Sequence, residues 1–199
     1  MRTANIAVLV SGGGTNLQAL IDAQEKGIIK SGKIRLVISS KAGAYALERA
    51  AKAGIPTAVC EKKVLKEGFE AEILRLLEET EIDVIVLAGF MTILSADFVK
   101  RYPERIINIH PSLIPSFCGA GFYGLKVHEA ALDYGVKVTG ATAHFVNEIP
   151  DGGKIIMQKA VYIEDGDTPE ILQRRVMENA EWIILPQAVE MVCSEITNA

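Results

Sequence analysis

The chain has 199 residues and a net charge of −4, and 49% of its residues are hydrophobic while 23% are charged. This length and balance are those of one globular domain with a substantial core. The acidic charge argues against a broad basic surface for a nucleic-acid backbone, although a local pocket of backbone amides would still bind a phosphorylated small molecule.

The apolar runs and the cysteines indicate in which cellular compartment the protein is expected. The longest apolar run near the N-terminus, residues 6–10, is far too short to span a bilayer or to act as a signal sequence. Cys60, Cys118 and Cys193 are scattered and make no CxxC pair or metal-ligand cluster. We therefore expect a cytoplasmic protein with reduced thiols, no metal, and neither a membrane nor a nucleic acid as partner.

Strand-like and helix-like segments alternate over the first 110 residues. The alternation predicts a mostly parallel, twisted α/β sheet with right-handed crossovers and helices on both faces, which is a Rossmann-like arrangement. We expect strands at residues 5–10, 33–39, 56–60, 83–87 and 105–109, and helices at 15–26, 44–53 and about 66–79.

The pattern changes after residue 135. Residues 137–147 and 154–163 are strand-like and are separated by a turn at Asp151-Gly-Gly153, so they form either an irregular hairpin or an antiparallel addition to the sheet edge. Thr168-Pro169 then opens a long C-terminal helix that should run to about Ile196. No repeat or linker is present, and we expect residues 1–199 to form one domain.

A glycine-rich corner, residues 11–16 (Ser-Gly-Gly-Gly-Thr-Asn), joins the first predicted strand to the first helix. In a parallel sheet this corner lies at the carboxyl edge, where ligands bind. Glycines allow close approach of the backbone, and the first N–H groups of a helix favour an anion. The corner therefore predicts a phosphate site, and a merely tight turn is the plainer alternative.

Two nucleotide motifs fit this corner poorly. Leu17 stands where the third glycine of a dinucleotide fingerprint would fall, and the second strand does not end in the expected acidic residue. Ser39 and Lys41 at that strand end would suit a phosphorylated ribose, so an NADP oxidoreductase stays open as a disfavoured alternative. A P-loop is excluded because no Gly-Lys-Ser/Thr follows the glycines.

Polar side chains mark the end of the fifth predicted strand. Strand alternation places Asn108 and His110 on the same side of the strand. There the amide could donate a hydrogen bond to an oxyanion, and the imidazole could donate a proton or a hydrogen bond near neutral pH. The plainer alternative is a polar pair whose hydrogen bonds are satisfied within the strand end. By pattern alone, Asp151 is more typical of a turn former. His144 and His128 are likewise more typical of structural residues.

Four motifs together resemble one family over essentially the full chain: residues 11–17, residues 87–91 (Leu-Ala-Gly-Phe-Met), residues 108–112 (Asn-Ile-His-Pro-Ser), and residues 144–153 from His-Phe-Val to Asp-Gly-Gly. The chain resembles the folate-dependent phosphoribosylglycinamide formyltransferases. The resemblance implies the formyltransferase version of the Rossmann-like fold, with 10-formyltetrahydrofolate as cosubstrate and no metal. It implies transfer of the formyl group to the amine of 5-phosphoribosylglycinamide in purine biosynthesis by a monomer or homodimer.

The resemblance also assigns roles to individual residues. Asn108 and His110 would stabilise a tetrahedral intermediate, and Asp151 would raise the pKa of His110 and relay a proton. The substrate phosphate would lie at Gly14, Thr15 and Asn16, and Glu181 would hold the ribose. The folate would contact Lys66, Met91, Thr92, Ile93, Leu94 and Asn108.

Some positions depart from the family pattern. The segment 116–124 looks longer and richer in glycine and aromatic residues than is usual, which would suit either a lid or an oligomer contact. Thr92 stands where many relatives carry arginine, Lys154 where proline is common, and Trp182 where histidine is common.

Two relatives with the same chemistry fit the sequence less well. The resemblance implies that a methionyl-tRNA formyltransferase would carry a further C-terminal domain and a basic surface, and a formyltetrahydrofolate hydrolase a further N-terminal domain. We expect neither for this acidic chain with a strand at residue 5. The joint presence of Asn108, His110 and Asp151 argues against a non-catalytic folate-binding or nucleotide-binding module.

Overall fold

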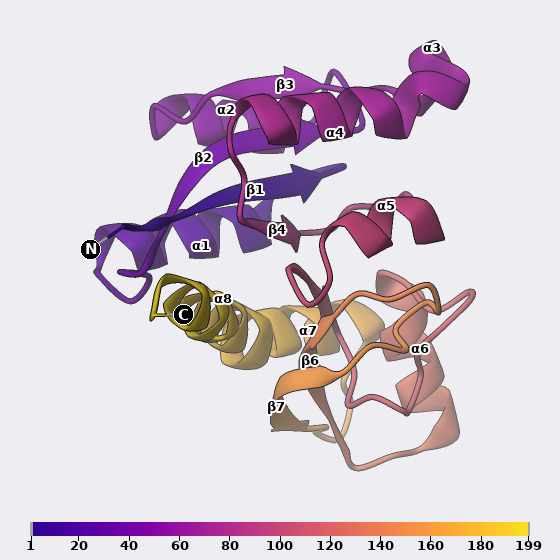
Figure 1. Ribbon diagram of the computed structural model, residues 1–199. Helices are drawn as coiled ribbons and strands as arrows, with labels where there is room; N and C mark the ends of the chain where they lie inside the picture. Colours follow the sequence, from indigo (N-terminus) through magenta and orange to yellow (C-terminus); the bar gives the residue numbers. More distant parts are fainter. Residues whose placement is uncertain (1, 199) are drawn as a thin grey trace.

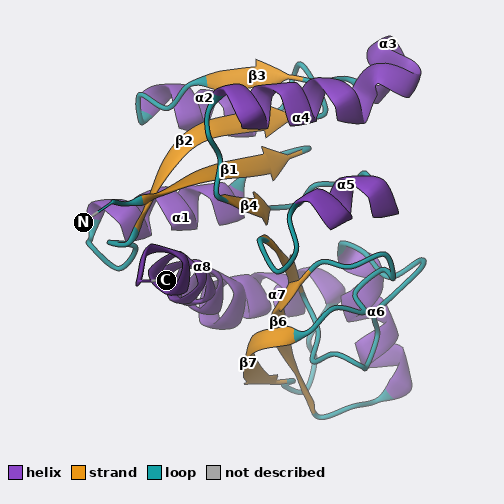
Figure 2. Cartoon of the chain, in the orientation of Figure 1, coloured by secondary structure: helices purple, strands orange, loops and turns teal. Residues whose placement is uncertain are grey.

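The computed structural model describes residues 2–198, in which the strands lie side by side in one seven-stranded sheet (Figure 1, Figure 2). The spatial order of the strands is β3-β2-β1-β4-β5-β6-β7. Their bounds are β1 (Ala4–Val10), β2 (Gly32–Ser39), β3 (Thr57–Val59), β4 (Val84–Leu87), β5 (Ile106–His110), β6 (Val138–Phe145) and β7 (Ile155–Tyr162).

The pairing confirms a mostly parallel sheet with an antiparallel C-terminal element. Strands β1 to β5 pair in parallel with one another, whereas β6 pairs antiparallel with β5 and β7 antiparallel with β6. The last two strands therefore form an antiparallel pair that also extends the sheet edge. The strand order reverses between β1 and β4, and in open α/β sheets the crevice at such a switch point is where ligands bind.

Helices cover both faces of the sheet, as the alternation predicted. The helices are α1 (Thr15–Glu25), α2 (Tyr45–Lys52), α3 (Lys62–Leu65), α4 (Phe69–Glu79), α5 (Ala96–Arg101), α6 (Leu125–Tyr134), α7 (Pro169–Val176) and α8 (Trp182–Asn198), with a 3-10 turn η1 (Lys66–Gly68) and a π-helical segment η2 (Met177–Glu181).

The core consists of two hydrophobic clusters, one on each face of the sheet. In β1, Ile6, Val8 and Val10 point to the face covered by α1, α2 and α8, while Ala7 and Leu9 point to the face covered by α4 and α5. Because both faces are buried, the strand sequence is a continuous apolar run and not an alternating one.

The structure corrects the extent of two predicted helices and adds one helix that was not predicted. The helix predicted from about residue 66 begins at Phe69 and is preceded by the separate short elements α3 and η1. Helix α5 was not predicted, although Ser95 provides a signal because its hydroxyl accepts a hydrogen bond from the amide of Phe98 at 3.2 Å. The long C-terminal helix opens at Thr168-Pro169 as predicted but is interrupted by η2. Within residues 2–198, no helix has the length and apolar content needed to cross a membrane.

Candidate active site

Strand β5 carries the polar pair to the carboxyl edge of the sheet. Asn108 lies directly opposite His144 in the β5–β6 register, and the Asn108 Nδ2 atom is 3.2 Å from His144 Nε2. His144 Nδ1 lies 2.8 Å from the carbonyl oxygen of Phe145, which places a proton on Nδ1. The His144 Nε2 atom is then free to accept a hydrogen bond from the Asn108 amide.

The turn after β6 brings Asp151 to the same place. Asp151 has a positive φ of 55°, and a Cβ added at Gly153 would lie 1.7 Å from the Phe145 carbonyl oxygen, so the turn closes tightly on β6. Asp151 Oδ2 is 3.5 Å from His110 Nδ1, and Asp151 Oδ1 is 3.6 Å from His144 Nε2. The carboxylate thus lies between the two imidazoles.

His110 is buried and its tautomer is set by the backbone. Its Nε2 donates a hydrogen bond to the carbonyl oxygen of Phe117 at 2.9 Å, so the Nδ1 lone pair of the neutral ring faces Asp151. Burial lowers the pKa of His110 below its ordinary value, and this cause outweighs Asp151 and the Phe117 carbonyl, which both raise the pKa. Asp151 therefore raises the His110 pKa as expected, but burial lowers it by more, so the net pKa lies below its ordinary value.

Asp151 remains a carboxylate in this environment. Burial alone would raise its pKa, but its contacts with His144 and the Gly119 amide, together with the nearby His110, lower the pKa below its ordinary value. The Gly119 N–H donates to Asp151 Oδ2 at 2.9 Å. A charged acceptor is thus held beside a neutral imidazole.

Two features of this cluster were missed from the sequence. The strand pattern around His144 is typical of a structural residue, yet its side chain contacts both Asn108 and Asp151. Its position opposite Asn108 depends on the pairing of β5 with β6. The segment 116–124 is not only a surface loop, because the backbone of Phe117 and Gly119 contacts His110 and Asp151. A sequence motif identifies side chains, whereas the contacts of Phe117 and Gly119 are made by main-chain atoms.

A mostly apolar cavity of about 150 Å³ opens beside the cluster, and its lining includes Asn108, His144 and Asp151. His110 is only 4% exposed and lies behind Asp151, outside the lining. Met91, Thr92, Ile93 and Leu94, predicted to contact the cosubstrate, all line this cavity. Lys66 is exposed and does not line this cavity.

The glycine corner forms the amino end of α1. Gly14 has a φ of 71°, and a Cβ added there would lie 2.6 Å from the Ala46 side chain, so glycine is required by both conformation and packing. No side chain caps the amino end of α1, which leaves its first N–H groups available. Thr15 is exposed beside these amides.

Asn16 and Glu181 meet across the corner. The Asn16 Nδ2 atom donates a hydrogen bond to Glu181 Oε2 at 2.7 Å, while the buried Oδ1 of Asn16 has no hydrogen-bond partner within residues 2–198. Burial raises the pKa of Glu181 to about 7, although the Asn16 amide opposes the shift. Glu181 ends the π-helical segment η2, and such segments often occur at functional sites.

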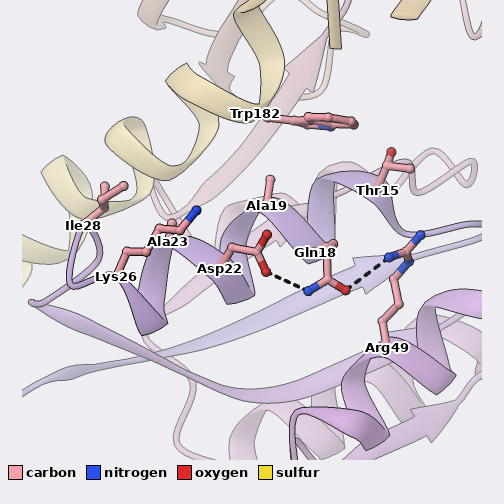
Figure 3. Close-up of a pocket in the computed structure, with 9 residues that line it drawn as sticks. All are labelled: Thr15, Gln18, Ala19, Asp22, Ala23, Lys26, Ile28, Arg49 and Trp182. Atoms are coloured by element: carbon pink, nitrogen blue, oxygen red, sulfur yellow. Dashed lines mark hydrogen bonds between the residues drawn. The ribbon is translucent and has the colours of Figure 1, made fainter. Parts of the chain in front are cut away.

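A further cavity of about 290 Å³ lies on the outer side of α1 (Figure 3). The Trp182 ring lies across it from Ala19, and hydrogen bonds link Asp22 to Gln18 and Gln18 to Arg49. Among the predicted site residues it contains only Thr15, so we do not place the reaction there.

The fold and the site together define an α/β enzyme that acts on small molecules at the carboxyl edge of its sheet. An uncapped helix end, a buried carboxylate and an apolar cavity lined in part by an amide, an imidazole and a second carboxylate lie around the switch point. Within residues 2–198, histidine, cysteine and acidic residues form no group of three or more that could hold a metal.

Comparisons with known proteins agree with this class. Residues 4–189 match the formyl transferase family model, so the chain belongs to the formyl transferase family. The chain is 42% identical to phosphoribosylglycinamide formyltransferase of Escherichia coli K12, over 93% of this chain and 85% of that protein. It is similar in structure to glycinamide ribonucleotide transformylase 1 of Symbiobacterium toebii, with a TM-score of 0.90 and 39% identity, over 97% of this chain and 89% of that one.

The chain also matches part of a larger human protein. It is 47% identical to the human trifunctional purine biosynthetic protein adenosine-3 over 97% of this chain, but it spans only 19% of that protein's length. The family match, residues 4–189, spans all seven strands and the four motifs described above.

Proposed function

We propose that this protein transfers the formyl group of 10-formyltetrahydrofolate to the amine of 5-phosphoribosylglycinamide, a step of purine biosynthesis. The observation that carries the proposal is the position of Asp151 between His110 and His144. Asp151 and His144 line an apolar cavity at the sheet edge that also carries the glycine corner.

The apolar cavity suits the folate. Its lining combines hydrophobic side chains such as Leu87, Ile93 and Leu94 with a smaller number of polar groups, which is typical of a small-molecule site. Met91 is 57% exposed and Ile93 is 73% exposed, so both offer apolar surface to a ligand. The polar groups of the lining would place the formyl group beside Asn108 and Asp151.

The glycine corner suits the phosphorylated amine substrate. The free N–H groups at the start of α1, with Gly14, Thr15 and Asn16, would bind the phosphate. Glu181 is buried and needs polar partners, and the two ribose hydroxyls would supply hydrogen-bond donors to its carboxylate. The phosphate and the ribose would hold the amine so that it reaches the formyl carbon.

The chemistry follows from the groups around the cavity. The amine nitrogen forms a bond to the formyl carbon, and the formyl oxygen gains negative charge that the Asn108 amide stabilises by donating a hydrogen bond. The proton released by the amine is accepted by Asp151, which shares it with the facing Nδ1 atom of His110. It returns to N10 of the folate as the bond between N10 and the formyl carbon breaks.

The lowered pKa of His110 supports this direction of proton transfer. A ring that is neutral at pH 7 has a free Nδ1 lone pair and can accept a proton, and the adjacent carboxylate stabilises the imidazolium that forms. His144 would position the Asn108 amide through the 3.2 Å contact between the two side chains.

A direct assay tests the function. The protein is mixed with 10-formyltetrahydrofolate and 5-phosphoribosylglycinamide, and the appearance of deformylated folate is followed by absorbance. We expect His110→Ala and Asp151→Asn to lower kcat by ~10²–10⁴ with little change in nucleotide affinity. Asp133→Asn, an exposed change on α6, is the matched control and should keep full activity.

Three results would contradict the proposal. Near-normal turnover by His110→Ala would remove His110 from the reaction. Deformylation at the same rate without the nucleotide would make the protein a hydrolase. Binding of NADP in place of the folate would favour the oxidoreductase alternative. The phosphate assignment has a separate test, because Asn16→Ala should mainly raise the nucleotide KM.

A further inference from the structure

The cavity on the outer side of α1 has no role in the proposed reaction, yet its lining is typical of a ligand site. Its volume of about 290 Å³ is near the lower end of what small-molecule sites have. One wall is the half-buried ring of Trp182, the first residue of α8, and the opposite wall is the surface of α1 around Ala19 and Ala23 (Figure 3). We call it the tryptophan cavity.

The tryptophan cavity suits a flat aromatic ring. The Trp182 ring is seen nearly edge-on in Figure 3, so one face of the indole is turned toward Ala19 on α1. A planar ring placed between them would stack on the indole, and the short side chains of Ala19 and Ala23 leave room for it. Stacking of a base on an aromatic side chain is a strong contribution to nucleotide binding.

The polar groups of the lining offer one acceptor and one charged donor. Gln18 Nε2 donates a hydrogen bond to Asp22 Oδ1 at 2.8 Å, and Arg49 Nη1 donates one to Gln18 Oε1 at 3.1 Å. Within residues 2–198, Asp22 Oδ2 and Arg49 Nη2 have no hydrogen-bond partner. Neither Asp22 nor Arg49 forms an ion pair in this part of the chain, and Lys26 adds a second positive charge to the lining.

We propose that the tryptophan cavity binds a nucleoside monophosphate with an amino-substituted purine base, such as adenosine monophosphate, and that this ligand weakens binding of the phosphorylated substrate. The purine stacks on Trp182, its amino group donates a hydrogen bond to Asp22, and its phosphate accepts hydrogen bonds from Arg49. Because Gln18 separates Asp22 from Arg49, the ligand must carry its donor and its anion on different parts, as a nucleotide does. Two basic residues against one acidic residue favour an anion over a neutral nucleoside.

The tryptophan cavity is connected to the glycine corner. Thr15 belongs to both, and Arg49 Nε donates a hydrogen bond to the Gly13 carbonyl oxygen at 2.8 Å. Trp182 directly follows Glu181 in the chain. A phosphate held at Arg49 therefore lies near the amino end of α1, and its charge repels the substrate phosphate proposed to bind there. This effect on the substrate rests on the proposed function, whereas the binding site itself does not.

The chain provides its own probe of the tryptophan cavity. Trp182 is the only tryptophan, so its fluorescence reports directly on occupancy. Adenosine monophosphate, inosine monophosphate (which lacks the amino group) and inorganic phosphate are each titrated into the wild type, with and without saturating 5-phosphoribosylglycinamide. We expect saturable quenching by adenosine monophosphate under both conditions, and none by phosphate. Inosine monophosphate should bind about tenfold more weakly, because the hydrogen bond to the Asp22 carboxylate is missing.

Two substitutions each remove one contact. Asp22→Ala should lower the affinity for adenosine monophosphate about tenfold and leave the affinity for inosine monophosphate unchanged. Trp182→Leu should lower the affinity for both nucleotides about tenfold or more, measured by calorimetry because the fluorophore is gone. Asp133→Ala, a change at an exposed position on α6, is the matched control and should bind both nucleotides like the wild type. Without added nucleotide, Asp22→Ala should keep kcat and both KM values within about twofold of the wild type, which shows that it is folded.

Steady-state kinetics test the effect on the substrate. Adenosine monophosphate should raise the KM for 5-phosphoribosylglycinamide about 2- to 5-fold and then have no further effect, while kcat stays unchanged. A KM that keeps rising in proportion to the added nucleotide would mean competition at the glycine corner and would overturn the inference. A KM that does not change although the nucleotide binds would refute the connection between the two sites.

The binding measurements can also overturn the inference. Absence of saturable quenching up to about 5 mM adenosine monophosphate, a range in which even millimolar binding is visible, would exclude this ligand. Equal affinities of the wild type for the two nucleotides would remove Asp22 from recognition, and unchanged affinities in Trp182→Leu would place the ligand elsewhere. If the protein transfers no formyl group, the fluorescence and calorimetry results still decide the binding site, so failure of the proposed function is distinguishable from failure of this inference.

Discussion

His128 on α6 should make the folded protein less stable in mild acid. Its side chain is fully buried, and neither ring nitrogen has a hydrogen-bond partner within residues 2–198. Burial lowers its pKa from 6.5 to about 4, with a smaller contribution from the charge of nearby His110. The folded state therefore keeps a neutral ring at a pH where the unfolded chain has already bound a proton.

The sign and size of the effect follow from proton linkage. Between pH 6.5 and 4 the unfolded chain binds more protons than the folded one, so the free energy of unfolding falls as the pH falls. With these two pKa values, His128 accounts for a loss of about 2 kcal/mol between pH 7.5 and pH 5.0. His110 contributes in the same direction, because its pKa is also lowered.

Replacing the imidazole by an apolar group isolates this contribution. In His128→Leu, the drop in unfolding free energy between pH 7.5 and pH 5.0 should be smaller by about 2 kcal/mol than in the wild type. At pH 7.5 the variant should differ from the wild type by less than about 1.5 kcal/mol, because no hydrogen bond is lost. The measurement is urea unfolding followed by circular dichroism at both pH values.

A matched control and a clear contrary result complete the test. Lys126→Gln changes an exposed residue of the same helix, and it should keep the full drop. If His128→Leu shows the same pH dependence as the wild type, then His128 does not titrate as argued, and its buried environment has been misjudged.

Three further variants test the site. Gly14→Ala should raise the nucleotide KM about tenfold or more in steady-state kinetics, because φ is 71° and the new methyl group would lie 2.6 Å from α2. Gly153→Ala should lower kcat by ~10²-fold, because its Cβ would lie 1.7 Å from the Phe145 carbonyl and the Asp151 turn must shift. Raising the pH from 6 to 8 should lower the wild-type nucleotide KM about tenfold, because Glu181, with a pKa of about 7, becomes charged. Glu181→Gln should abolish that dependence, and an unchanged profile would remove Glu181 from the ribose site.

Much of the fold could be predicted from local sequence. A strand that is buried on both faces must be apolar along its length, and the amphipathic segments between such strands must be helices that cover them. These constraints placed β1, β2, β4 and β5 to within one residue at each end. The break between η1 and α4 and the short helix α5 carried weaker signals, because short elements depend on tertiary contacts more than on periodicity.

The candidate site could be predicted only in part. Asn108, His110 and Asp151 were found through motifs, and the structure places the last two 3.5 Å apart. The sequence did not reveal His144, because its contact with Asn108 arises from an antiparallel register between β5 and β6. Lys66, which the family resemblance places near the folate, is exposed and is absent from the lining of the apolar cavity, so its role stays a prediction.

The sequence by itself determined the order of the elements, the class of the sheet and the edge on which polar side chains gather, because hydrophobic period and turn chemistry are local properties. Only the tertiary structure decided the tautomer of His110 and the direction of its pKa shift. The net pKa of His110 depends on how deeply the ring is buried, and its tautomer depends on the Phe117 carbonyl. Burial and main-chain contacts between distant segments exist only once the chain has folded.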